Sequence, residues 1–243
     1  MSWAEFQSLF SPLDLAAVCV LFAAWLSIGW RIEHPSARRP SVSRLMAEYR
    51  REWMRQMVMR NPRIFDAQTL STLRQGTSFF ASASMLAIGA VLAAIGNAEQ
   101  LVGIAQDLSI AHDPKLVWEV KLLVVMFFLT NAFLKFVWSH RLFGYCAVLM
   151  GAVPNDPADP VAIPRAAKAG EINITGARSY NQGLRSVYFA LGSTAWLLGP
   201  WLLIGAVAVT CWVLWRREFA SRSRSFLIEN ADGMGHTRTS TDK

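Results

Sequence analysis

LVWEVKLLVVMFFLTNAFLKFVW, residues 116–138, is the stretch that decides the fold, because it is an apolar helix bracketed by tryptophans. Trp118 and Trp138 are 20 residues apart, which corresponds to about 30 Å along an α-helix, the hydrocarbon thickness of a bilayer. Tryptophan favours the headgroup level of a membrane, so the pair marks the two rims of a membrane-spanning helix. The segment therefore predicts a membrane protein.

The composition of the whole chain agrees with a membrane protein. Of its 243 residues 53% are hydrophobic and only 17% are charged, which is too apolar for an ordinary soluble domain. Four stretches are long enough to cross a bilayer: residues 13–30, 79–96, 116–138 (with a possible extension to Met150) and 187–215. We expect an all-α, multi-pass bundle of about four transmembrane helices, one domain over residues 1–220, and a polar, disordered tail at 221–243.

The arginines predict an orientation. Residues 31–75 hold ten arginines, whereas residues 97–115 hold one lysine against three acids, and the first twelve residues hold no basic residue. Basic loops favour the cytoplasm, so we expect a periplasmic N-terminus and cytoplasmic loops at 31–78 and 139–186 of a bacterial inner membrane protein. The N-terminus lacks the basic region of a signal peptide, so the first span should be retained.

One segment does not fit this orientation. Four spans place the C-terminal tail outside, yet the tail begins with the basic run RREFASRSR. The Gly199-Pro200 pair inside residues 187–215 can break a helix, so this stretch is either one kinked span or two half-membrane segments. We favour the single kinked span.

Residues 42–60 predict a basic amphipathic helix. Apolar side chains recur at helical spacing with arginines between them, a pattern that suits the cytoplasmic membrane surface or the ends of the spans. Its candidates for binding anionic phospholipid or a partner are Arg44, Arg51, Trp53 and Arg55. The helix ends at Asn61-Pro62, and a second helix from about Ile64 to Gln75 is expected to run into the next span.

Residues 79–96 carry small side chains on one helix face. Small residues let membrane helices approach closely. We therefore expect this span to be the tightly packed centre of the bundle, through Ala83, Ala87, Gly89, Ala90 and Ala94.

Five polar residues fall in or at the rims of the predicted spans: Asp14, Glu119, Lys121, Asn131 and Lys135. Asp14 follows Ser11-Pro12 and fits a helix-capping box, and Glu119 lies four residues after Lys115. We expect the lysines to extend to the headgroups, Asp14 to pair with Lys121, and Asn131 to tie helices together. The alternative is an ion or proton path.

A second basic cluster lies before the last span. If residues 165–188 are helical, Arg178, Asn181 and Arg185 share one face. With Arg60, Arg63 and Asp66 they could form an interlocked surface or an anion pocket. The alternative, which we favour, is that they pair with helix ends and contact lipid headgroups.

Catalytic and cofactor signals are weak. The sequence has no HExxH, GxSxG, P-loop or GxGxxG motif, so we expect no enzyme activity. His34 and His140 would be the axial pair of a haem, but His34 precedes a proline in a loop, so haem is disfavoured. Cys19, Cys146 and Cys211 form no CxxC pair, and we expect packing roles and no disulfide.

Four stretches carry a family resemblance: His34-Pro35, REWMRQMVMRNPRIFD at 51–66, QGTSFFASASMLAIGA at 75–90 and ARSYNQGLRSVYFALG at 177–192. In these the chain resembles the bacterial and plant membrane proteins of domain of unknown function 599. The resemblance implies about four spans and supplies no activity or site.

Charge and span pattern together favour a non-enzymatic membrane protein. Its expected partners are anionic phospholipid at the cytoplasmic face and either further copies of itself or a membrane complex, with no nucleic acid. A small oligomeric channel or transporter subunit is the alternative.

Overall fold

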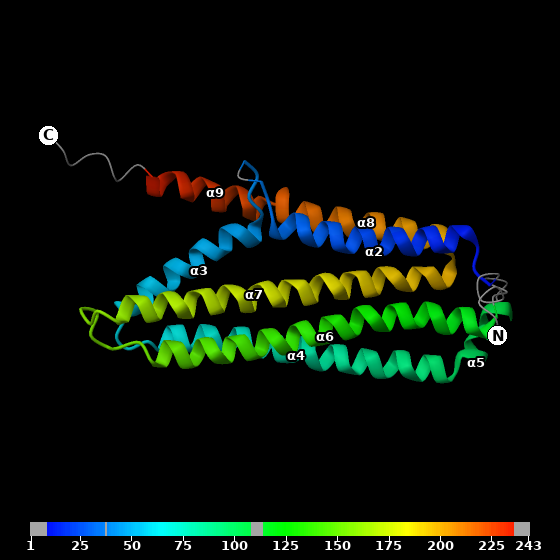
Figure 1. The fold of residues 1–243 in the computed structure, drawn as a ribbon, viewed down its shortest axis with the longest axis horizontal. Helices are drawn as coiled ribbons and strands as arrows, with labels where there is room; N and C mark the ends of the chain where they lie inside the picture. Colours follow the sequence, from blue (N-terminus) through cyan, green and yellow to red (C-terminus); the bar gives the residue numbers. More distant parts are fainter. Residues whose placement is uncertain (1–8, 37, 108–113, 236–243) are drawn as a thin grey trace.

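In the computed structural model, which describes residues 9–36, 38–107 and 114–235, the chain is an elongated bundle of helices that run side by side (Figure 1). The helices are α2 (Pro12–Glu33), α3 (Val42–Val58), α4 (Ile64–Gly96), α5 (Ala98–Asp107), α6 (Lys115–Gly151), α7 (Ala162–Ser193), the 3₁₀ turn η1 (Thr194–Leu198), α8 (Pro200–Phe219) and α9 (Arg222–Gly235). The expected all-α class is confirmed.

Three helices are long and apolar enough to cross a membrane, namely α2, α4 and α6. Helix α2 begins with the predicted capping box, in which Ser11 and Asp14 bond to each other's backbone N–H groups. The predicted span at 79–96 is the second half of α4, because the helix that starts at Ile64 runs into it as expected. Helix α6 continues past Trp138 to Gly151.

The prediction of one kinked span over 187–215 is wrong. Helix α7 ends at Ser193, and after η1 the chain reverses at Gly199, whose φ of +133° is a conformation that glycine tolerates. Pro200 then opens α8, where its missing N–H costs nothing. Figure 1 shows α8 returning beside α2, antiparallel to α7. The chain breaks at Gly199-Pro200, as the two-segment alternative requires, and the 20 residues of α8 extend about 30 Å.

This reversal brings the chain after α8 back to one end of the bundle. Figure 1 shows α9 at the same end as α3 and the α6–α7 turn, and we call this the arginine-rich end. The predicted disordered tail is wrong for residues 222–235, which form α9, while 236–243 lie outside the described residues. Arg224 Nε donates to the Pro40 carbonyl at 2.9 Å and holds α9 to the α2–α3 loop.

The centre of the bundle is α6 with α7, and the expected central role of the small-residue face on α4 is wrong. In the 18-residue apolar stretch of α4 only 11% of the residues are buried, against 39% in the corresponding stretch of α6. A Cβ on Gly89 would meet nothing within 4 Å, whereas a Cβ on Gly183 of α7 would lie 2.7 Å from Phe136 of α6. Small residues permit close packing but do not choose the neighbour. Ala83, Gly89 and Ala90 are exposed, whereas Ala87 packs against the first apolar cluster.

Two apolar clusters hold the helices together. In the first, the Phe128 ring stacks on Phe22 and Phe189, with centroids 5.4 and 6.0 Å apart, and so joins α6 to α2 and α7. In the second, Met54 and Met57 of α3 are fully buried against α6 and α7. The amphipathic helix predicted at 42–60 is confirmed as α3, and it buries its apolar side on the bundle.

Candidate functional site

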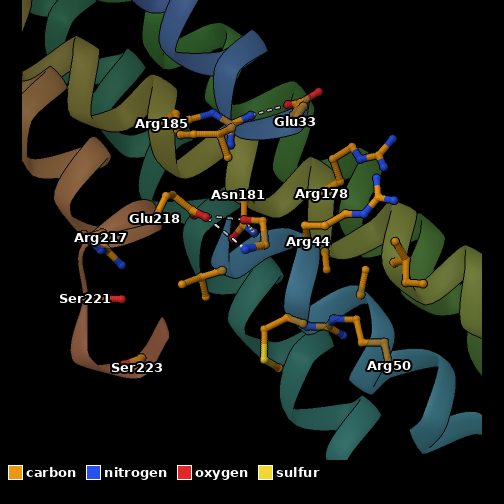
Figure 2. A pocket seen from close by; sticks show the side chains of 17 residues that line it. Glu33, Arg44, Arg50, Arg178, Asn181, Arg185, Arg217, Glu218, Ser221 and Ser223 are labelled. Atoms are coloured by element: carbon orange, nitrogen blue, oxygen red, sulfur yellow. Dashed lines mark hydrogen bonds and ion pairs between the residues drawn. The ribbon is translucent and has the colours of Figure 1, made fainter. Parts of the chain in front are cut away.

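A cavity of about 500 Å³ opens at the arginine-rich end, between the end of α2, the start of α3, the middle of α7 and the α8–α9 connection (Figure 2). We call it the arginine cavity. Its charged and amide lining residues are Glu33, Arg44, Arg50, Arg178, Asn181, Arg185, Arg217 and Glu218. Five arginines thus face two glutamates, which makes the cavity electropositive.

Serines at the start of α3 fix one wall of the cavity. Ser41 caps α3 by accepting from the Arg44 N–H, and its hydroxyl donates to the Ile32 carbonyl at 3.0 Å. The Ser43 N–H and hydroxyl each donate to the Glu218 carboxylate at 3.0 Å. A carboxylate at a helix N-terminus is favoured by the helix dipole, so α8 and α3 hold each other in place.

A buried ion pair forms the back of the cavity. Arg185 of α7 is only 7% exposed, and its Nη2 donates to Glu33 Oε1 at the end of α2. The same oxygen accepts a bond of 2.8 Å from Gln182 Nε2. Breaking such a pair would leave a buried charge, so it fixes α2 against α7.

Arg44 and Arg178 have no such partners. Both are exposed, and within the described part of the chain neither guanidinium makes an ion pair or a side-chain hydrogen bond. In Figure 2 both guanidinium groups point to the same side of the cavity, away from Glu33 and Glu218. Two cations held on one wall repel each other, and a bound anion would relieve that repulsion.

The other two arginines of the cavity are engaged. Arg50 donates to Asn173 Oδ1, and its burial lowers the pKa of its guanidinium from the ordinary value, although arginine stays protonated. Arg217 donates to the Tyr188 hydroxyl and lies 5.7 Å above its ring. These two shape the cavity and add positive charge to it.

A second arginine cluster lies on the far side of α3. Asp66 is fully buried and accepts from Arg60 and, at 2.7 Å, from Trp53 Nε1. Arg63 donates to the carbonyls of Val153 and Pro154 at 2.7 and 2.6 Å. We call Trp53, Arg60, Arg63 and Asp66 the Asp66 cluster. They do not line the arginine cavity, so the expected union with Arg178, Asn181 and Arg185 does not form.

The remaining basic candidates on α3 lie outside the cavity. Arg51 pairs with Glu171 at 2.6 Å and Glu48 at 2.7 Å, and Arg55 pairs with Glu52 at 3.3 Å. All of these side chains are well exposed. The predicted surface set therefore divides, and only Arg44 of α3 joins Arg178, Asn181 and Arg185.

At the opposite end, Trp196 lies between two of the predicted polar residues. Its Nε1 donates to Asp14 Oδ1 at 2.8 Å, and Lys121 Nζ lies 5.9 Å above its ring. Lys121 also acts electrostatically on Asp14. The expectation that Lys121 extends to the headgroups is wrong, because its side chain is only 3% exposed and packs inside the bundle. Glu119 lies 4.0 Å from Lys115, which pairs more closely with Glu99 at 2.7 Å.

Asn131 and Lys135 line a second cavity, of about 260 Å³, between α2, α6 and α7. We call it the lateral cavity. Asn131 Nδ2 donates to Ser186 Oγ at 2.6 Å, so it ties α6 to α7. The lining residues are Trp25, Leu26, Gly29, Trp30, Glu33, Asn131, Lys135, Gln182, Arg185 and Ser186.

The histidines make separate local contacts. The His34 ring stacks on Trp30 with centroids 5.5 Å apart, whereas His140 Nδ1 lies 3.3 Å from Thr77 Oγ1. No group of three or more metal-ligating side chains occurs among the residues that the structure describes. The three cysteines are free thiols.

Four cavity residues were missed by sequence reasoning: Glu33, Arg50, Arg217 and Glu218. Glu33 and Glu218 each lie in the last turn of an apolar helix. In the sequence, an acidic residue at such a place looks like an ordinary solvated side chain, so nothing marks it as part of a site. Arg217 belongs to the C-terminal run that a four-span arrangement would place on the periplasmic side. Only the reversal at Gly199 brings it to the cavity.

Comparison with known proteins finds a family but no characterised relative. No curated protein and no solved structure matches the chain. The model of the family described as "Protein of unknown function, DUF599" matches residues 16–223, which include both cavities and all of α2 except its first residues. This chain, an all-helical bundle with three candidate spans among its described residues, is thus a member of the DUF599 family.

Proposed function

We propose that this protein is a non-enzymatic membrane protein that binds the phosphate group of an anionic phospholipid in the arginine cavity. The observation that carries the proposal is the pair Arg44 and Arg178, which line the cavity without an ion pair among the described residues. Guanidinium groups bind phosphate through paired hydrogen bonds, and basic pockets beside membrane helices suit lipid headgroups. The cavity lies at the end of α2, one of the three candidate spans, and this is the level at which we expect lipid phosphates.

The same proposal includes an orientation and a span number. The arrangement supports five crossings, by α2, α4, α6, α7 and α8, with the arginine-rich end in the cytoplasm of a bacterial inner membrane. An odd number of crossings removes the conflict with the basic run at Arg216–Arg224, since that run then joins the other arginines. A C-terminal reporter that is active only in the cytoplasm should therefore be active.

Binding is tested with the full-length protein in mild detergent. The double variant Arg44→Gln/Arg178→Gln should bind phosphatidylglycerol about a hundredfold more weakly or worse, because each of the two lost charge-assisted bonds contributes about 1.5 kcal/mol or more. Its free energy of unfolding should change by less than about 0.5 kcal/mol, since neither side chain makes an ion pair or side-chain hydrogen bond with the described residues, and the electrostatic effect of Arg178 on exposed Glu171 is screened by solvent. Titration with phosphatidylglycerol, phosphatidylcholine and inorganic phosphate separates anionic lipid, zwitterionic lipid and free anion.

The matched control is Arg38→Gln/Arg55→Gln, which removes the same charge from side chains outside both cavities. It should bind phosphatidylglycerol within twofold of the unchanged protein. Equal losses in the two double variants would mean that lipid binds through diffuse charge and not in the cavity. Tighter binding of inorganic phosphate than of lipid would assign the cavity to a soluble anion.

Assembly as a homo-oligomer or as a subunit of a membrane complex is part of the proposal, and it is measured by the mass of the detergent-extracted particle. A channel or transporter subunit is the second candidate, favoured by the interior position of Asn131 in the lateral cavity. Ion or solute flux into liposomes that falls in Asn131→Ala would support that candidate.

A further inference from the structure

The lateral cavity and the arginine cavity share two lining residues, Glu33 and Arg185. These are the partners of the buried ion pair, so the pair stands between the two spaces. Figure 2 shows the Glu33 carboxylate and the Arg185 guanidinium joined at one edge of the arginine cavity. Moving Glu33 away from Arg185 would therefore connect the cavities.

Arg185 has unused capacity for an anion. A guanidinium carries five N–H donors, and within the described residues Glu33 is its hydrogen-bond partner. A phosphate offers more acceptor oxygens than a carboxylate and matches the guanidinium in a two-bond geometry. Glu33 thus holds the place that a phosphate oxygen would take, and it has Gln182 Nε2 as a second partner.

The lateral cavity faces the apolar side of the bundle. Leu26 and Trp30 of α2 line it and are 62% and 64% exposed, so in a bilayer they contact lipid. A Cβ added to Gly29 between them would meet nothing within 4 Å, which shows that the cavity is open there. Lys135 lines its other side, makes no ion pair with the described residues, and lies one helical turn before Trp138, at headgroup depth.

We propose that the lipid phosphate reaches the arginine cavity sideways, from the leaflet at the arginine-rich end, through the lateral cavity. Lys135 is its first cationic contact, and the phosphate then displaces Glu33 from Arg185 to connect the two cavities. The acyl chains stay outside, against Leu26 and Trp30. This route rests on the proposed function, and it adds the gate and the direction of approach.

The first test fills the lateral cavity. Gly29→Phe places a ring in open space, and Gly205→Phe on α8 is the matched control, since a Cβ there also meets nothing within 4 Å and Gly205 lines neither cavity. Association of acyl-labelled phosphatidylglycerol with the detergent-purified protein is followed by energy transfer from its tryptophans. Gly29→Phe should slow association at least tenfold, while the affinity for inorganic phosphate, which reaches the cavity from water, stays within twofold.

The second test removes the gate charge. Glu33→Gln should speed association of phosphatidylglycerol and lower its dissociation constant about tenfold, because the phosphate no longer competes with a carboxylate for Arg185. Glu52→Gln, an exposed change of the same charge on α3, should alter neither quantity. If Glu33→Gln does not fold, the Gly29→Phe result decides alone.

The outcomes separate this route from the proposed function. Unchanged association in Gly29→Phe, with normal binding otherwise, would overturn the lateral route and leave the arginine cavity as the site. A parallel loss of inorganic phosphate binding would also overturn it, since Gly29 would then belong to the site itself. Absence of phosphatidylglycerol binding in the unchanged protein would overturn the proposed function.

Discussion

The arginine cavity and the Asp66 cluster use the same residue type at the same end of the molecule, but in opposite ways. In the Asp66 cluster Arg60 bonds to a buried carboxylate and Arg63 to backbone carbonyls. In the arginine cavity Arg44 and Arg178 face open space and, within the described residues, have no side-chain partner.

This difference shows how structural arginines can be told from candidates for binding. An arginine that bonds to a buried carboxylate or to backbone carbonyls of the protein stabilises the fold, and its loss should destabilise the chain without a separate effect on a ligand. An arginine that makes no such bond adds little stability, so its position beside a cavity favours an external anion as its partner. Variants on the two sides should therefore separate stability from binding.

The largest stability loss is expected for Asp66→Ala. Asp66 is fully buried, and its removal leaves the Trp53 N–H and the Arg60 guanidinium without their acceptor, which should cost about 3 kcal/mol. Unfolding by denaturant in mild detergent measures the loss, with Glu52→Ala as the exposed control. If Asp66→Ala lost no more stability than Glu52→Ala, the structural role assigned to the Asp66 cluster would be contradicted.

Arg63→Gln should have the next largest effect. Its charged bonds to the carbonyls of Val153 and Pro154 hold the α6–α7 turn to the start of α4, and their loss should cost about 2 kcal/mol. The control Arg38→Gln removes the same charge from the surface. Weaker phosphatidylglycerol binding in folded Arg63→Gln than in Arg38→Gln would contradict the division between the two arginine groups.

The exposed pair Arg51–Glu171 should contribute least, under about 1 kcal/mol. The hydrogen bond from Arg51 lowers the pKa of Glu171 below its usual 4.5. A carboxyl whose pKa is lowered on folding stabilises the protein above its unfolded pKa and loses that contribution as pH falls through the folded pKa. Arg51→Gln should therefore show a small deficit in the free energy of unfolding at pH 7, and the deficit should disappear as the pH falls through the folded pKa of Glu171.

The sequence predicts the long helices well, because their signals are local. The capping box at Ser11 and the apolar run of α6 act within a few residues, and both are present as expected. The reversal after α7 was not predicted because Gly199-Pro200 breaks a helix without fixing the direction that follows. Only the packing of α8 against α2 and α7 decides that α8 turns back.

The candidate site was predicted only in part, for the same reason. Helical spacing placed Arg178, Asn181 and Arg185 on one face, and these three do line one cavity. Glu33 lies 152 residues before Arg185, and Glu218 lies 33 residues after it, on the other arm of the α7–α8 hairpin. No spacing rule finds either of them. Likewise, no local rule separates Arg44 from Arg51, whose partner Glu171 lies on another helix.

The tight turn at Gly199 has a consequence for how the chain is made. Helix α7 carries Arg178 and Arg185, and a charged residue costs about 2.5–3.5 kcal/mol when a helix partitions into the bilayer by itself. Helix α8 follows after only η1 and Gly199, and it is apolar until its last turn. If α7 and α8 both cross the membrane, as in the proposed five crossings, we expect the two helices to insert together as one hairpin.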